Sequence, residues 1–315
     1  MKKEEERLNL PKGESLLSPE EIGTYFMIEN PNNIIAVVDI GQPRISSTAR
    51  AIVAASGSGF DEVHFQPWKY IQRYAKSLSK LGHNPSVTIS GEGEKKRLIL
   101  LKETPGGPND PKENFDPVGI LIAKGVPPNQ IRVMLGIREP FAQFASWYKF
   151  DNSRRPEIFL KGQQFIYSLL EKYRNQGILV VPFIFELFYP NPEDYLKFLY
   201  QQLGIANSVS LPQDLAFSKN PPVIWHEADT RLDLLSLEAD VGSKYFERVV
   251  APVLQQGKFQ ITQPRFSIPK NPDPNLIEAF ENYREKAISF YQESVKRGLP
   301  RNKDFEVFIT ELNNY

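Results

Sequence analysis

The sequence predicts an α/β protein built on a doubly wound parallel sheet, flanked by helices and followed by a helical C-terminal portion. Apolar runs rich in Ile and Val alternate along the chain with stretches of helical periodicity. This alternation is typical of parallel sheets, because each parallel connection has to cross over the sheet, usually as a helix. The runs are continuously apolar, as expected for strands that are buried on both faces.

The strands are predicted from these apolar runs and from the turn residues that bound them. The first run ends at Gly41, and the run that begins at Arg97 is closed by a Thr-Pro-Gly-Gly-Pro turn. A Pro and a Glu interrupt the last run, which is nevertheless the longest apolar stretch of the chain. We expect strands over residues 34–40, 97–103, 131–137 and 178–188, with a short extended piece over 60–65.

The helices are predicted from periodicity and from their boundary residues. Pro140 suits a first helical turn, because an N–H group at that position has no acceptor within the helix and its absence costs nothing. The segment that begins at Asn191 opens with acidic residues. They favour a helix start, because their negative charge interacts favourably with the positive end of the helix dipole. We expect helices over residues 49–56, 67–81, 120–124, from 139 onward, 159–175, 191–204 and 274–297, and mostly helical structure over 223–252.

Composition excludes several classes of function. Lys plus Arg and Asp plus Glu each number 38 in 315 residues, so the chain has no overall charge to attract nucleic acid or an anionic membrane. The absence of cysteine excludes disulfides, thiolate metal sites and a cysteine nucleophile. The three histidines, His64, His83 and His226, lack the spacing of a zinc hydrolase, so no metal is expected.

The domain organisation is predicted to be simple. We expect a charged leader over residues 1–30 and a single domain over residues 31–315, since no repeat or linker divides the chain. The N-terminus lacks the apolar core of a signal peptide, and the stretch 178–188 is too short to span a bilayer. The expected location is therefore the cytoplasm.

A loop with phosphate-binding character follows the first predicted strand. Ligands of doubly wound sheets bind outside the carboxyl ends of the strands. A loop that enters a helix offers unpaired N–H groups and a positive dipole end, to which Arg44 adds charge. The alternative is an ordinary hydroxyl-rich helix cap. The GxxxxGK[ST] signature is absent, which disfavours a P-loop kinase or ATPase. The loop residues are Pro43, Arg44, Ile45, Ser46, Ser47 and Thr48.

A second candidate anion site follows the strand over residues 131–137. Arg138 comes directly after this strand, and Ser146 lies eight residues later on the predicted helix. A guanidinium and a hydroxyl in this arrangement can bind a phosphate. The alternative is a surface ion pair between Arg138 and Glu139, with a buried serine.

Taken together, these two elements resemble the sulfotransferases that use 3′-phosphoadenosine 5′-phosphosulfate (PAPS). The stretch 43–48 is similar to the family loop that holds the 5′-phosphosulfate. Arg138-Glu139-Pro140, together with Ser146, is similar to the family motif that holds the 3′-phosphate. Phe185-Glu186-Leu187 looks like the family element beside the adenine. The resemblance covers residues 34 to about 204. It implies a P-loop-NTPase-like sulfotransferase fold with PAPS as co-substrate.

The sequence departs from the family pattern at several positions. Ile45-Ser46 stands where Ser-Gly is usual, and Arg44 where many members have Lys. The Arg-Lys-Gly stretch of eukaryotic cytosolic members has no convincing counterpart. Many members also carry a Lys-x-His sequence, whereas here Lys102 is followed by Glu and Thr.

The resemblance gives candidates for the catalytic residues. One branch of the family uses a Glu after the second strand as the base, which makes Glu62 the first choice and His64 the second. Lys102 is the candidate for an additional cation near the sulfuryl group. The alternatives are a capping role for Glu62, a packed strand-end histidine at His64 and a solvated Lys102.

We therefore expect a sulfotransferase that moves a sulfuryl group from PAPS to a hydroxyl or amine. The acceptor is a small molecule, a carbohydrate or a peptide, and no nucleic acid, membrane span or metal is expected. A second hypothesis is a catalytically inactive relative that binds the nucleotide or a partner. The unusual Ile45-Ser46 and the missing Lys-x-His motivate this second hypothesis.

Overall fold

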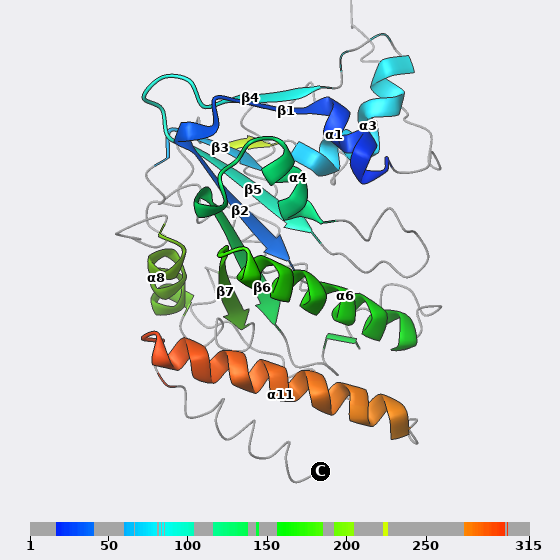
Figure 1. Ribbon diagram of the computed structural model, residues 1–315, viewed down its shortest axis with the longest axis vertical. Coiled ribbons are helices and arrows are strands. Elements are labelled where there is room, and N and C mark those ends of the chain that lie inside the picture. The colour runs from blue at the N-terminus through cyan, green and yellow to red at the C-terminus, as the bar shows by residue number, and fades with distance from the viewer. Residues whose placement is uncertain are drawn as a thin grey trace, which may run out of the picture.

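The computed structural model describes residues 17–40, 60–65, 67–80, 82, 84, 86–103, 116–137, 143–144, 156–184, 192–204, 223–225, 274–299 and 301. These residues form a six-stranded sheet in the order β7-β6-β2-β5-β3-β8 and a two-stranded sheet of β1 and β4 (Figure 1). Every strand pairing is parallel. The predicted α/β class with a parallel sheet is thereby confirmed.

The strands agree closely with the apolar runs. Two differences stand out. The strands β1 and β4 were not expected, because four residues are too few to show a period. The expectation of helix from Val223 is wrong for Val223–Trp225, which pairs with β3 as an edge strand. The strands are β1 (Phe26–Glu29), β2 (Ile34–Ile40), β3 (Glu62–Phe65), β4 (Val87–Ser90), β5 (Arg97–Glu103), β6 (Ile131–Ile137), β7 (Leu179–Ile184) and β8 (Val223–Trp225).

Each described α-helix begins with a proline, which suits the first position because no N–H is needed there. The helix α4 starts earlier than expected, because the Asp116 side chain caps it by accepting the Gly119 N–H at 2.8 Å. The expected helices over 49–56 and from 139 lie outside the described residues, apart from 143–144. The helices are α1 (Pro19–Tyr25), α3 (Pro67–Lys80), α4 (Pro117–Ala123), α6 (Pro156–Asn175), α8 (Pro192–Leu203) and α11 (Pro274–Lys296), with short 3-10 turns η1 (Pro31–Asn33) and η3 (Pro128–Gln130).

The segment before residue 31 contributes to the core. Ser18 and Glu21 form a reciprocal capping box at the start of α1. Ile22 and Phe26 are fully buried. The rings of Phe26 and Trp68 pack edge to face, with their centroids 5.6 Å apart. Side chains from this segment, like that of Trp68, therefore belong to the core.

Both faces of the large sheet are covered. Consecutive residues of β2 and β6 are buried, so neither face of these central strands meets solvent. The helices α6, α8 and α11 contact β7, and α6 and α11 run side by side (Figure 1). Tyr167 of α6 stacks on Phe290 of α11, and the ammonium of Lys286 lies 4.4 Å from the Tyr167 ring centroid. The sheet is thus doubly wound, as predicted.

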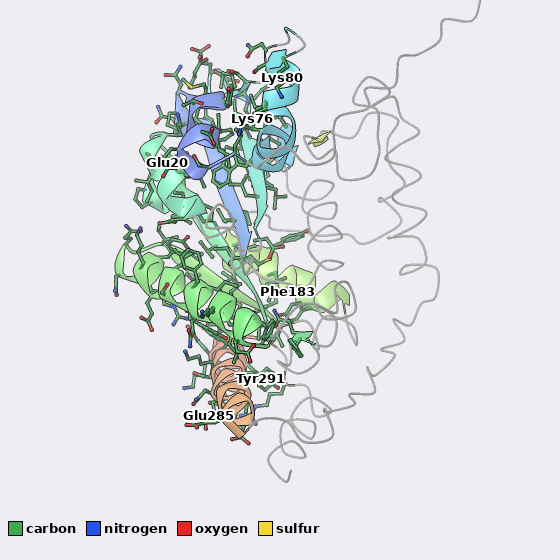
Figure 2. The ribbon with its side chains drawn as sticks, turned by 90° about the vertical axis from the view of Figure 1, so that its right-hand side faces the viewer. Glu20, Lys76, Lys80, Phe183, Glu285 and Tyr291 are labelled. Atoms are coloured by element: carbon green, nitrogen blue, oxygen red, sulfur yellow. The ribbon has the colours of Figure 1, made fainter. Side chains whose placement is uncertain are left out.

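Figure 2 shows the long axis of the molecule, with Lys76 and Lys80 of α3 near one end and Glu285 and Tyr291 of α11 near the other. Within the described ranges, no helix combines the length and apolar content that a membrane crossing demands.

Candidate functional site

The strand order places the topological switch point of the large sheet at the carboxyl ends of β2 and β6. These two strands are neighbours, in register at Ile40 and Leu135. The connection that leaves β2 leads to β3 on one side of the sheet, whereas the connection that leaves β6 leads to β7 on the other. Connections that diverge from adjacent strands define the topological switch point at which such sheets bind ligands.

The segments predicted to bind the nucleotide all leave the sheet at this edge. The stretch 43–48 follows β2 after two residues, and Arg138 follows β6 directly. Phe185 follows β7, which is in register with β6 at Ile184 and Ile137. Lys102 lies on β5, the other neighbour of β2, in register with Asp39. The predicted residues therefore lie on, or follow in the sequence, the four consecutive strands β7, β6, β2 and β5.

The predicted residues differ in how far the structure describes them. The backbone of Lys102 lies in β5, and both Glu62 and His64 lie in β3. The remaining predicted site residues lie outside the described residues: Pro43, Arg44, Ile45, Ser46, Ser47, Thr48, Arg138, Ser146 and Phe185.

Glu62 lies at the amino edge of the sheet. It is the first residue of β3 and in register with Arg97, which is in turn level with Ile34 of β2. Ile40 is six residues further along β2, and a rise of about 3.3 Å per residue separates the two levels by about 20 Å. Lys102 is five residues beyond Arg97, an odd number, so Glu62 and Lys102 also belong to opposite faces of the sheet.

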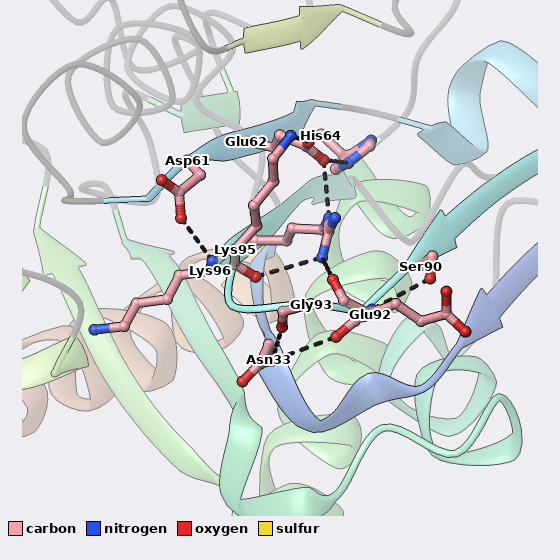
Figure 3. Close-up of polar contacts among 11 residues, drawn as sticks. Asn33, Asp61, Glu62, His64, Ser90, Glu92, Gly93, Lys95 and Lys96 are labelled. Carbon is pink, nitrogen blue, oxygen red and sulfur yellow. Dashed lines mark hydrogen bonds and ion pairs between the residues drawn. The ribbon is translucent and has the colours of Figure 1, made fainter.

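The carboxylate of Glu62 is held by two cations (Figure 3). Lys95 Nζ donates to Oε1 and Arg97 Nε donates to Oε2, each at 2.9 Å. The hydrogen bond from Lys95, reinforced by Arg97 against the opposing effect of burial, lowers the pKa of Glu62 from 4.5 to about 2. Glu62 is therefore an ionised partner of these cations at neutral pH.

Arg97 and the neighbouring Asp61 also bind the turn between β4 and β5. Arg97 also donates from Nη1 to the backbone oxygen of Glu92 at 2.9 Å, and Asp61 Oδ2 accepts the Lys96 N–H at 2.7 Å. On the other side of the turn, Asn33 Nδ2 donates to the Gly93 oxygen at 2.6 Å (Figure 3). These hydrogen bonds satisfy backbone groups of the turn, which does not pair with a neighbouring strand.

His64 lies on the same face of β3 as Glu62 and is only 6% exposed. Its Nε2 is 3.6 Å from Oε2 of Glu62. Burial lowers the pKa of His64 below its ordinary value, although the Glu62 carboxylate partly offsets this effect. The imidazole is thus mainly neutral at pH 7, level with Ile99 and about 10 Å along the strands from Lys102.

Asp39 is a residue that the sequence reasoning missed. It is the penultimate residue of β2 and only 3% exposed. The available signal was a single acidic residue within an otherwise apolar run, since a carboxylate is almost never buried in a sheet without a reason. Among the described residues, no group of three or more His, Cys, Asp or Glu side chains could hold a metal ion.

Comparisons with known proteins give structural likenesses only. No family model matches the chain, and no curated protein sequence matches it. The sulfotransferase domain from the Synechococcus PCC 7002 olefin synthase is 16% identical with a TM-score of 0.41, over 81% of this chain and 95% of that chain. Mouse sulfotransferase SULT7A1 complexed with PAP is 12% identical with a TM-score of 0.41, over 85% of this chain and 96% of that chain. Likenesses at this level do not establish an activity.

Proposed function

We propose that this protein is a PAPS-dependent sulfotransferase. The observation that carries the proposal is that β2 and β6 are neighbours at the topological switch point, since the two candidate phosphate-binding motifs follow these strands in the sequence. Two phosphate sites on neighbouring strands suit a nucleotide with separate 5′ and 3′ phosphates. The eight-residue spacing of Arg138 and Ser146 supports the assignment of the second motif to the 3′-phosphate.

Each candidate residue has a distinct role in the proposed reaction. The loop over residues 43–48 holds the 5′-phosphosulfate, with Arg44, Ser47 and Thr48 as donors. Arg138 and Ser146 bind the 3′-phosphate, and Phe185 lies beside the adenine.

The proposed transfer is a direct displacement at sulfur. The acceptor oxygen or nitrogen forms a bond to sulfur while the bond from sulfur to the bridging phosphate oxygen breaks. The electron pair of that bond leaves with 3′,5′-diphosphoadenosine (PAP), and positive charge near this oxygen stabilises it. Lys102 is the candidate that supplies this charge from β5.

The acceptor proton passes to a base. Both candidates on β3 belong to the face opposite to Lys102, and of the two His64 has the protonation state that this step requires. A pKa of about 2 makes Glu62 a poor proton acceptor at neutral pH, and its two cations occupy both oxygens. His64 is mainly neutral, so its imidazole is able to take a proton.

Calorimetric titration with PAP, adenosine 5′-phosphate and ATP–Mg²⁺ tests the nucleotide site. We expect micromolar binding of PAP and at least tenfold weaker binding of adenosine 5′-phosphate. Arg138→Ala should abolish this preference, whereas Arg301→Ala, at an exposed arginine, should retain it. No binding of PAP, or a preference for ATP–Mg²⁺, would refute the proposal.

A catalytically inactive, nucleotide-binding relative is the second candidate, favoured by the unusual Ile45-Ser46. Incubation of the protein with PAPS and a panel of phenolic, carbohydrate and peptide acceptors distinguishes the active enzyme from the inactive relative. Release of PAP that depends on an acceptor indicates the enzyme. Tight PAP binding without such release indicates the inactive relative.

A further inference from the structure

The last residue of β7 is tied to the helix that follows it. Among the described strands, β7 is the terminal one of the six-stranded sheet. At such an edge, backbone N–H groups need acceptors other than a neighbouring strand. The hydroxyl oxygen of Tyr195 on α8 accepts the Ile184 N–H at 2.6 Å, and this hydrogen bond is buried. Tyr195 thus supplies the acceptor for the last amide of β7.

Aromatic packing fixes the ring that carries this hydroxyl. Tyr195 is only 3% exposed, and its ring meets that of Phe183 edge to face, with the centroids 5.4 Å apart. Phe183 belongs to β7 and is fully buried (Figure 2). On the other side, the ring of Phe198 lies 6.2 Å away, about one helical turn further along α8. The hydroxyl of Tyr195 is therefore held in place by contacts of its ring with both the strand and the helix.

A second tyrosine of α8 provides an internal comparison. Tyr200 is also 3% exposed, but within the described part of the chain its hydroxyl has no hydrogen-bond partner. A buried tyrosine usually finds such a partner, since an unpaired hydroxyl is costly in the interior. Tyr195 and Tyr200 thus share a helix and a degree of burial, and they differ in the hydrogen bond to β7.

The hydrogen bond lies beside the proposed nucleotide site. Ile184 is in register with Ile137, the residue that precedes Arg138 in the sequence. The residue after Ile184 is Phe185, which is proposed to lie beside the adenine. Consecutive Cα atoms are about 3.8 Å apart, so a shift of the backbone at the end of β7 displaces the start of the next segment.

We propose that Tyr195 is a positioning residue for the base of the nucleotide: its hydroxyl holds the end of β7 and thereby sets where the segment that begins at Phe185 starts. The hydrogen bond is a property of the fold, whereas the role toward the base rests on the proposed sulfotransferase function. The phosphates are proposed to bind segments that follow β2 and β6. Loss of the hydroxyl should therefore change recognition of the base and spare that of the phosphates.

Hydrogen exchange tests the anchoring contact without any nucleotide. Deuterium uptake at the Ile184 amide is measured by mass spectrometry with residue-level fragmentation in the wild type, Tyr195→Phe and Tyr200→Phe. The first substitution keeps the ring and its packing and removes only the oxygen. We expect the Ile184 amide to exchange about tenfold faster in Tyr195→Phe, because local opening no longer breaks this hydrogen bond. Tyr200→Phe should leave the exchange of Ile184 unchanged.

Two nucleotides that differ only in their base test the positioning role. Calorimetric titrations compare PAP with 3′,5′-diphosphouridine for the same three proteins. We expect the preference for PAP to fall about fivefold in Tyr195→Phe, while the affinity for 3′,5′-diphosphouridine changes by less than about twofold. Tyr200→Phe should retain both affinities. A residue that only stabilised the fold would affect the two nucleotides alike.

The outcomes separate this inference from the proposed function. Unchanged exchange of Ile184 in Tyr195→Phe would overturn the anchoring contact. If exchange rises and PAP binds, but the preference for PAP is unaltered in Tyr195→Phe, the positioning role is wrong and the sulfotransferase proposal stands. If exchange rises but the wild type does not bind PAP, the contact stands, and the sulfotransferase proposal fails together with the role toward the base.

Discussion

The two edges of the large sheet use charged residues in different ways. At the amino edge, Glu62 bonds to Lys95 and Arg97, and the same arginine bonds to the turn before β5. At the carboxyl edge, Asp39 is buried in the central strand beside the point where the candidate nucleotide loop begins. Charge at the first edge holds the backbone of a turn, whereas charge at the second edge lies beside the segment proposed to bind the nucleotide. Substitutions at the two edges should therefore change different properties.

The largest effect is expected from Arg97→Met at the amino edge. The side chain of Arg97 is only 11% exposed, and its loss leaves the Glu62 carboxylate without the more buried of its two cations. We expect a loss of about 3 kcal/mol in unfolding free energy by denaturant titration. PAP affinity of the folded protein should be unchanged. Lys95→Met is the matched control, with a loss below about 1 kcal/mol because its side chain is 61% exposed.

The converse behaviour is expected for Arg138→Ala at the carboxyl edge. Loss of a charge-assisted phosphate contact should weaken PAP binding by about 100-fold, equivalent to about 2.7 kcal/mol. The KM for PAPS should rise far more than the KM for the acceptor. Unfolding free energy in the absence of nucleotide should be close to that of the wild type. Equal changes in both KM values would argue against a role in the donor site.

Glu62→Gln should lower unfolding free energy by about 2 kcal/mol at pH 7, since hydrogen bonds to an ionised carboxylate are lost. The folded pKa of about 2 lies below the ordinary 4.5, so ionised Glu62 stabilises the folded state above pH 4.5. This contribution disappears as the pH falls from about 4.5 to about 2. Denaturant titrations of both proteins across this range should converge, and a constant difference would contradict the role of the charge.

The smallest effect is expected at His64. Its imidazole should titrate below 6.5 by NMR, because burial disfavours the charged form. The folded state then binds a proton less readily than the unfolded chain, so its stability falls as the pH drops from 6.5 through the folded pKa. In Glu62→Gln the His64 pKa should fall further, since the nearby carboxylate is gone. A rise would show that another group controls this titration.

The strands of the core could be predicted because their apolar runs are continuous. A run such as Ile34–Ile40 has no amphipathic period to confuse with a helix, and Gly41 closes it. The three strands that were missed, β1, β4 and β8, have four, four and three residues. Runs this short are stabilised by their partners rather than by local preference, so the sequence alone does not identify them.

The candidate site could be predicted only in part. The order of strand, loop and helix indicated which segments lie at a carboxyl end, but not which edge Glu62 occupies. That assignment depends on the start of β3, because a strand beginning at Glu62 places this carboxylate at the amino edge. The register of Asp39 with Lys102 brings together residues 63 positions apart, and no local pattern contains it.

The sequence by itself determined the class of fold and indicated the segments that we propose to bind anions. Hydrophobic pattern, prolines and hydroxyl-rich turns are local properties, and local physics is sufficient to interpret them. The tertiary structure alone decided the strand order, and with it which segments meet at one edge and which charges face each other. Strand order depends on contacts between residues distant in the chain, whose energies no local pattern contains.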